Sequence, residues 1–147
     1  MSIVSLETVR LHGRALDKQD AIRQAGELLV QGGCVMPLYV NGMLAREQTM
    51  STYLGNGVAI PHGQHENRTE VRRTGISVLQ LPEGVEWETG ERAYLVIGIA
   101  ADAEEHVSVL ANLAEVVEDI DAVNQLAQTS DPMLIIERLS RARVDED

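Results

Sequence analysis

Residues 93–100 read Ala-Tyr-Leu-Val-Ile-Gly-Ile-Ala, and this stretch decides the fold class. Leu95, Val96 and Ile97 are apolar on consecutive positions, whereas a strand with one face in water alternates apolar and polar residues. The run therefore predicts a central strand that is covered on both faces. Residues 75–81, Gly-Ile-Ser-Val-Leu-Gln-Leu, predict a second buried strand. Helices are accordingly expected on both sides of a sheet.

Helical patterns alternate with these strands. Asp17 followed by Asp20 predicts an N-cap, and an apolar stripe over residues 21–29 predicts an amphipathic helix that ends at Gly32-Gly33. A second helix follows Pro37, with Arg46 and Glu47 in its last turn or just beyond it. The other predicted elements are short strands at 9–11 and 58–61, a turn at Pro82-Glu83-Gly84 that leads to Trp87, a long helix capped by Asp102, a short helix from Asp121 to Ala127 and a last helix opened by Ser130 and Pro132.

The chain has 147 residues, of which 44% are hydrophobic, and this is enough for the core of one domain. No linker or repeat interrupts residues 1–147, so we expect a single domain with a frayed tail at 141–147. The start at Met1 favours a free-standing chain.

Cys34 is the single cysteine, which excludes an internal disulfide and indicates a reducing compartment. Without a secretory leader or a long apolar run, the sequence predicts a soluble, cytoplasmic protein.

The net charge is −11, from 12 Lys and Arg against 23 Asp and Glu. This charge opposes binding to the phosphates of nucleic acid and to an anionic membrane surface, so we expect neither nucleic-acid binding nor membrane insertion. The acidic excess either serves solubility or forms a face that steers a basic partner protein, and composition does not choose between the two.

His62 stands out among the four histidines, at 12, 62, 65 and 106, because of its neighbours. Gly55, Gly57 and Pro61 precede it and Gly63 follows it, so the backbone can bend sharply and be approached closely. Its imidazole is expected to project from a rigid strand end. An imidazole is largely neutral at pH 7, and its free nitrogen is a competent nucleophile toward phosphorus.

The run from Glu47 through Leu54-Gly-Asn-Gly-Val-Ala-Ile-Pro-His-Gly63 resembles the phosphorylation-site signature of a known family. That family comprises the enzyme IIA domains of the mannitol/fructose class in the bacterial phosphoenolpyruvate-dependent sugar phosphotransferase system. The resemblance covers nearly the whole chain and is closest to the mannitol type. It extends over residues 21–33, 39–47, 82–87, 95–101 and 105–106. It implies a single α/β domain with three layers, α/β/α, around a mixed central sheet.

The resemblance also implies a function, that of a phosphotransferase component with a phosphohistidine intermediate. His62 stands at the position of the phosphorylated histidine, which takes the group on Nε2 from the carrier protein HPr. It then passes the group to a cysteine of enzyme IIB, which phosphorylates a mannitol-like hexitol as the membrane unit IIC transports it. Arg46 and His106 match two further active-site positions. Glu47, Gly55, Ala59, Pro61 and Gly63 match signature positions and, with Gly57, are interpreted as shaping the site.

These roles agree with the chemistry of phosphoryl transfer, in which catalysis is alignment plus positive charge around the transferred oxygens. Arg46 would offer a rigid fork to two oxygens, and His106 an N–H donor at a helix N-terminus. Either residue would otherwise be an ordinary helix-surface side chain. No cofactor or metal is required, although His62, His65, Glu66 and His106 include ligand types that zinc accepts.

Two other hypotheses are open. In the first, the chain is a regulatory module that resembles the nitrogen-related enzyme IIA proteins, and phosphorylation of its His62 switches protein binding. Alternatively it would be a purely structural interaction domain, and then His62→Ala would leave every activity intact.

Overall fold

The buried strands predicted from the sequence form the middle of a mixed sheet in the computed structural model. The structure describes residues 3–101 and 103–140, and for residues 103–106 it describes the main chain alone. Within that part of the chain the sheet has five strands in the order β1-β4-β5-β3-β2. The strands are β1 (Val9–Arg10), β2 (Tyr53–Gly55), β3 (Val58–Ala59), β4 (Gly75–Glu88) and β5 (Glu91–Ala100). β1 and β3 run parallel to their long neighbours β4 and β5, whereas the β4–β5 and β2–β3 pairs are antiparallel.

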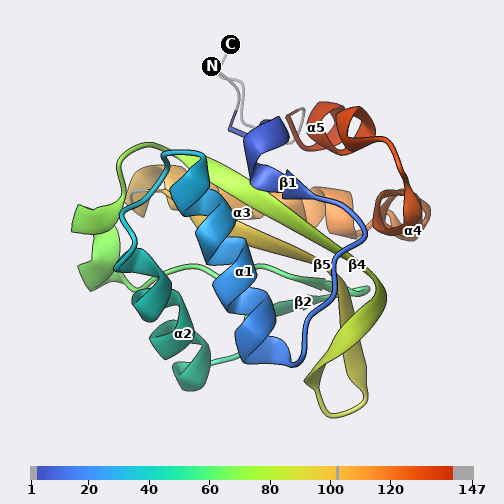
Figure 1. Ribbon diagram of the computed structural model, residues 1–147, viewed down its shortest axis with the longest axis horizontal. Helices are drawn as coiled ribbons and strands as arrows, with labels where there is room; N and C mark the ends of the chain where they lie inside the picture. The colour runs from blue at the N-terminus through green and yellow to red at the C-terminus, as the bar shows by residue number, and fades with distance from the viewer. Residues whose placement is uncertain (1–2, 102, 141–147) are drawn as a thin grey trace.

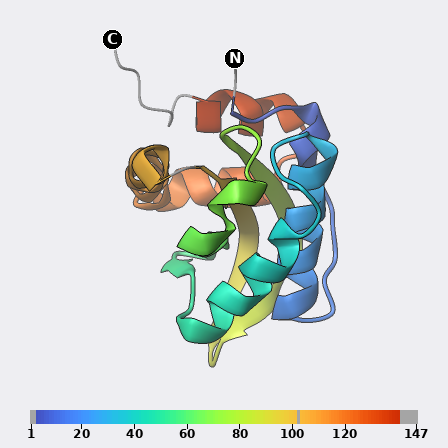
Figure 2. The same ribbon diagram turned by 90° about the vertical axis from the view of Figure 1, so that its left-hand side faces the viewer.

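Helices cover both faces of the sheet, as predicted (Figures 1 and 2). The helices are α1 (Lys18–Gln31), α2 (Tyr39–Thr49), α3 (Ala103–Val117), α4 (Ile120–Gln128) and α5 (Pro132–Ser140), with 3-10 turns η1 (Leu6–Thr8) and η2 (His65–Glu70). α1 and α2 bury one apolar cluster and α3, α4 and α5 bury the other. Val96 belongs to the first cluster and its neighbours Leu95 and Ile97 to the second. The interpretation of this run as a strand covered on both faces is confirmed.

The first helix begins as its cap predicts. The side chain of Asp17 accepts a hydrogen bond from the main-chain N–H of Asp20 at 2.8 Å, and the side chain of Asp20 accepts one from Leu16 at 2.9 Å. These two bonds satisfy main-chain donors that have no partner inside a helix. α2 likewise follows Pro37 and contains Arg46 and Glu47 in its last turns.

The turn predicted at Pro82-Glu83-Gly84 is wrong, because β4 continues to Glu88 and the chain reverses only near Gly90. The stretch is a bulge, marked by a shift in the β4–β5 register between Gln80 and Val85. The side chain of Arg92 donates hydrogen bonds to the carbonyls of Glu83 and Gly84. These bonds compensate for ladder bonds that the bulge loses.

The predicted cap of the short helix α4 is wrong, and the predicted cap of α3 lies outside the described residues. The cap of α4 is Asp119 and not Asp121, because the Asp119 side chain accepts from the N–H of Ala122 at 3.1 Å while Asp121 already lies in the first turn. Asp102, the expected cap of α3, and the expected frayed tail at 141–147 lie outside the described residues. None of the helices in the described ranges has the length and apolar character needed to span a bilayer.

Candidate functional site

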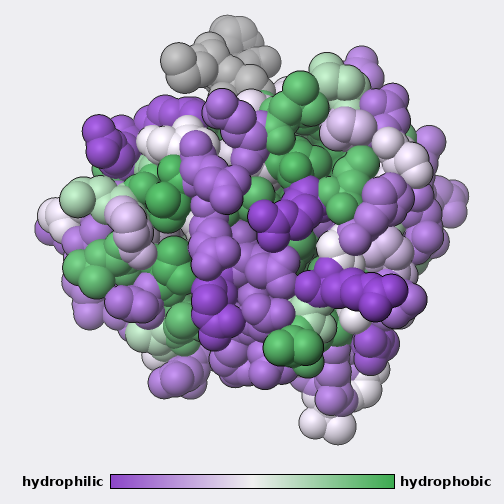
Figure 3. All heavy atoms as spheres, viewed as in Figure 1, coloured by the Kyte–Doolittle hydropathy of each residue, from purple (hydrophilic) through white to green (hydrophobic). Residues whose placement is uncertain are grey.

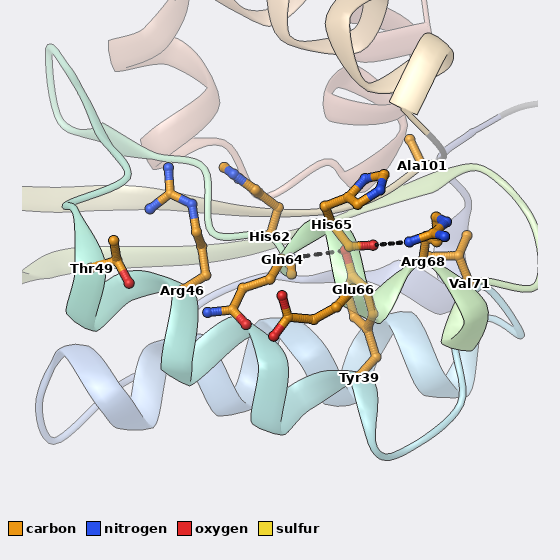
Figure 4. A pocket seen from close by; sticks show the side chains of 11 residues that line it. Tyr39, Arg46, Thr49, His62, Gln64, His65, Glu66, Arg68, Val71 and Ala101 are labelled. Atoms are coloured by element: carbon orange, nitrogen blue, oxygen red, sulfur yellow. Dashed lines mark hydrogen bonds between the residues drawn. The ribbon is translucent and has the colours of Figure 1, made fainter.

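A cavity of about 470 Å³ opens beside the end of β3, where α2 and η2 approach the sheet (Figure 4). Two of the residues singled out from the sequence, His62 and Arg46, line it together. The rest of the lining is Tyr39, Thr49, Gly63, Gln64, His65, Glu66, Arg68, Val71 and Ala101. The cavity therefore brings together cationic, imidazole and hydroxyl groups from three parts of the chain.

His62 lies three residues beyond β3, and its main chain is fixed to the central strand β5. It forms a parallel bridge with Ile99, whose N–H donates to the carbonyl of Pro61 at 3.0 Å. The residue is only 9% exposed, and Nδ1 of its imidazole lies 2.9 Å from the carbonyl oxygen of Ile60. A carbonyl can only accept, so Nδ1 carries the proton, and in the neutral ring the lone pair is on Nε2. The ring is thus held as one tautomer at the wall of the cavity.

The small residues and the proline before His62 each fit their position for a different geometric reason. Gly55 and Gly57 have φ values of +117° and +82°, which favour glycine, and they flank Asn56 in the turn between β2 and β3. Ala59 is fully buried in the cluster under α1 and α2, where a larger side chain has no room. Pro61 is buried and accepts the hydrogen bond from Ile99. These residues shape the strand end that carries His62.

Arg46 projects from the last turns of α2, and Figure 4 shows its guanidinium and the ring of His62 reaching toward the same side of the cavity. Its Nη1 donates to the carbonyl of Met50 at 2.7 Å, which fixes the side chain at the helix C-terminus. A guanidinium has five N–H donors, so this bond leaves a planar, permanently charged fork for an anion in the cavity.

Glu47, the next residue, points into the protein. Its side chain is buried and accepts hydrogen bonds from the N–H and hydroxyl of Thr52 and from Nε1 of Trp87, at 3.0, 2.6 and 2.9 Å. The carbonyl of Thr52 in turn accepts from the N–H of Ile60, whose own carbonyl holds the His62 ring. Glu47 therefore connects the end of α2 to the main chain that leads to His62, and its role in shaping the site stays a prediction.

The third expected site residue, His106, lies in α3 by its main chain, and its side chain lies outside the described residues. α3 begins at Ala103, two residues after the cavity residue Ala101, so its N-terminus lies at the cavity rim (Figure 4). A helix N-terminus offers main-chain N–H groups to an anion.

Several lining residues were not identified from the sequence. Tyr39 is buried, and its hydroxyl accepts the N–H of Gly63 at 2.9 Å and donates to the carbonyl of Ile99 at 2.8 Å. Burial raises the pKa of the Tyr39 phenol above its ordinary value, against the opposing effect of the Gly63 hydrogen bond. One signal was available, because Tyr39 and Arg46 are seven residues apart and a helix places such residues on one face.

His65, Glu66 and Arg68, interpreted from the sequence as parts of a wet loop, lie on η2 and are exposed at the cavity. Nη1 of Arg68 donates to the carbonyl of His65 at 3.1 Å. Among the side chains that the structure describes, no three His, Cys, Asp or Glu residues are arranged to hold a metal ion.

Known proteins resemble this chain over most of its length. Residues 2–142 match the family described as "Phosphoenolpyruvate-dependent sugar phosphotransferase system, EIIA 2". A multiphosphoryl transfer protein of Xanthomonas campestris is 47% identical over 97% of this chain, although the chain spans only 17% of that relative. The mannitol-specific phosphotransferase enzyme IIA component of Bacillus subtilis is 39% identical over 86% of this chain and 88% of its own length.

Solved structures show the same fold. The crystal structure of IIA mannitol from Escherichia coli has a TM-score of 0.86 and 42% identity, covering 92% of this chain and 97% of its own. The complex of enzyme IIAMTL with phosphorylated enzyme IIBMTL from the same organism gives a TM-score of 0.87 and 41% identity, covering 93% and 96%. The chain therefore belongs to the EIIA 2 family, whose members are phosphotransferase components. In sequence and fold it is a domain of the mannitol type.

Proposed function

We propose that this domain relays a phosphoryl group in bacterial sugar uptake, with Nε2 of His62 as the temporary carrier. The group arrives from the phosphohistidine of HPr and leaves to a cysteine of the cognate enzyme IIB. That unit then phosphorylates a mannitol-like hexitol during its transport by IIC. The observation that carries the proposal is the 2.9 Å contact between Nδ1 of His62 and the carbonyl of Ile60, beside the guanidinium of Arg46 in an open cavity.

Each transfer exchanges one bond to phosphorus for another. In the first, Nε2 of His62 forms a P–N bond as the P–N bond of phosphorylated HPr breaks, and the electron pair returns to the HPr histidine. In the second, the IIB cysteine sulfur forms a P–S bond as the His62 P–N bond breaks. The charge of the loose transition state lies on three equatorial oxygens, where Arg46 supplies positive charge and two parallel donors. His106 and the first turn of α3 supply further donors.

The partners of the relay follow from this scheme. HPr and enzyme IIB must each reach His62 in turn, so both dock over the cavity and both complexes are transient. The solved complex of the similar IIAMTL with phosphorylated IIBMTL supports the second partnership. IIC is reached only through IIB, and we place the relay in the cytoplasm. The transfers need no cofactor.

The test is to incubate the protein with phosphoenolpyruvate, enzyme I and HPr, and then to map acid-labile, base-stable phosphate by mass spectrometry. We expect one phosphate on His62 that passes to the cysteine of added enzyme IIB, and none in His62→Ala. A phosphate on another residue contradicts the assignment of His62. A phosphate on His62 that no enzyme IIB removes, but that alters binding to another protein, identifies the domain as a regulatory module instead.

A further inference from the structure

Tyr39, the first residue of α2, connects the two sides of the cavity. Its hydroxyl is placed between two main-chain groups on different elements, the N–H of Gly63 and the carbonyl of Ile99. The N–H can only donate and the carbonyl can only accept, so the hydroxyl accepts a hydrogen bond from Gly63 and donates one to Ile99. With its proton committed and its side chain only 3% exposed, Tyr39 is suited to hold geometry and not to exchange a proton with a substrate.

The close contact with Tyr39 also explains the glycine that follows His62. A Cβ on Gly63 would lie 2.7 Å from Cε1 and 2.8 Å from Cζ of the Tyr39 ring, closer than carbon atoms approach. Gly63 is not among the residues with positive φ, so its backbone conformation does not require glycine. Glycine is needed there because the tyrosine ring lies directly against the main chain next to His62.

Tyr39 shares its helix face with Arg46, two turns further along α2, and both side chains line the cavity. The carbonyl of Ile99 accepts the hydrogen bond from Tyr39, and the N–H of Ile99 donates to the carbonyl of Pro61. Tyr39 therefore fastens the helix that carries the guanidinium to the strand end that carries the imidazole. At the other end of α2, Glu47 fastens the helix through Thr52 and Trp87.

We propose that Tyr39 is a positioning residue for phosphoryl transfer, which sets Arg46 and His62 at the separation that the transition state requires. The inference rests on the proposed relay function. In-line transfer depends steeply on geometry, and a misplacement of about 1 Å costs about 100-fold in rate. Without the hydroxyl, Gly63 loses its acceptor and Ile99 its donor, and α2 is free to shift against the strand end.

The chain offers a matched control. The hydroxyl of Tyr53 also joins two main-chain groups, accepting from the N–H of Gly57 at 3.0 Å and donating to the carbonyl of Arg92 at 3.2 Å. Tyr53 is not part of the cavity wall. Tyr39→Phe and Tyr53→Phe therefore remove the same kind of bridge, one at the cavity and one away from it.

The experiment is single-turnover transfer from phosphorylated HPr at a series of donor concentrations. For Tyr39→Phe we expect the limiting rate to fall about 10- to 100-fold with the half-saturating HPr concentration changed less than about two-fold. Tyr53→Phe, whose bridge holds the β2–β3 turn at Gly57 and not α2, should lose much less of the limiting rate than Tyr39→Phe does. In Gly63→Ala, the added methyl group displaces the Tyr39 ring. This variant should therefore also show a lower limiting rate with little change in the half-saturating HPr concentration, even if its stability differs.

A double mutant identifies the route of the effect. If Tyr39 sets the position of Arg46 relative to His62, the loss in Tyr39→Phe/Arg46→Gln is smaller than the product of the two single losses. Equal rates for Tyr39→Phe and wild type, equal losses in the two phenylalanine variants, or a double mutant that multiplies the single losses would each overturn the inference. Failure of the wild type to become phosphorylated on His62 would instead overturn the relay function itself.

Discussion

Arg46 is the residue whose charge the proposed transfer uses most directly. It lines the cavity beside His62, and one of its donors is bound to the carbonyl of Met50. Removing one donor that stabilises transition-state charge costs about 100- to 1,000-fold in rate in well-studied enzymes. We therefore expect Arg46→Gln to slow transfer from phosphorylated HPr by about that factor and to weaken HPr docking far less, as measured by single-turnover kinetics and by titration calorimetry.

Arg23 provides the control for this variant. It is an exposed arginine on α1, 3.2 Å from Asp20 and outside the cavity. Arg23→Gln removes the same net charge and should leave the limiting transfer rate unchanged. Equal losses of rate and of HPr affinity in Arg46→Gln would contradict a role for its guanidinium in the chemical step.

Two buried groups that lose a proton at alkaline pH, the Cys34 thiol and the Tyr39 phenol, are expected to make stability depend on pH. Burial raises the pKa of the Cys34 thiol above its ordinary value of 9.0, against the opposing attraction of Arg73. Burial likewise raises the pKa of the Tyr39 phenol above its ordinary value of 10.0. The unfolded chain then releases these protons first, so stability is complete below the unfolded pKa values and is lost as pH rises through the folded ones.

Urea unfolding followed by the fluorescence of Trp87, the single tryptophan, tests this between about pH 7 and about pH 11. The free energy of unfolding should decline from about pH 9 upward, and in Cys34→Ala the decline should begin about one pH unit later. Identical pH profiles for the two proteins would show that the thiol is not buried as described.

The sequence marks the candidate site residues more clearly than it marks the residues that hold them in place. His62 and Arg46 were identified because a motif of adjacent residues marks them, and the structure places both at one cavity. Tyr39 was not identified because its hydroxyl acts on Gly63 and Ile99, which are 24 and 60 residues away in sequence. These two contacts depend on tertiary packing, and the seven-residue spacing of Tyr39 and Arg46 indicates a shared helix face but not the hydrogen bonds.

The element that sets the site is α2, and its C-terminal end depends on Glu47. Replacing Glu47 with leucine leaves the Thr52 hydroxyl and the N–H groups of Thr52 and Trp87 buried without their acceptor. Each unsatisfied group costs about 1–3 kcal/mol. For three such groups we expect Glu47→Leu to lower the free energy of unfolding by at least about 3 kcal/mol in urea titrations.

Two comparisons separate hydrogen bonding from charge in this variant. Glu47→Gln keeps an acceptor for both N–H groups, and the Thr52 hydroxyl can turn to accept from the amide, so its loss should be less than half that of Glu47→Leu. Glu27→Gln, at an exposed position on α1, should change stability by no more than about 0.5 kcal/mol. A Glu47→Leu protein as stable as Glu27→Gln would exclude the network as the support of α2.

The elements were predictable where local chemistry decides them. α1 begins at its Asp17 cap, and the buried core of β5 follows from its run of apolar residues. The bulge at residues 82–84 was mistaken for a turn because Pro and Gly mark both features. Two contacts across the fold accompany the continued strand: Arg92, on the paired strand β5, donates to the bulge carbonyls, and Trp87 donates to Glu47, 40 residues away. The short strand β2 escaped prediction for the same reason, since it exists through pairing with β3.

For the molecule as a whole, the charge of −11 predicts that electrostatic steering, if present, favours a basic partner. Figure 3 shows hydrophilic residues along α1 on the face viewed in Figure 1. A field of one sign speeds the encounter with an oppositely charged partner, and salt screens it. If the acidic excess steers a basic HPr, the association rate measured by stopped flow should fall several-fold from about 0.05 M to about 0.5 M salt. A rate that is flat across this range refutes steering and leaves solubility as the role of the charge.

In the proposed relay, Nε2 of His62 carries the phosphoryl group because Nδ1 keeps its proton in the contact with the Ile60 carbonyl. Nitrogen-15 NMR of the histidine-labelled protein, before and after phosphorylation by phosphoenolpyruvate, enzyme I and HPr, tests it most directly. We expect that His62 alone changes its bonding, with phosphorus coupled to Nε2 and a proton retained on Nδ1. Phosphorus on Nδ1 of His62, or on any other histidine, would contradict it.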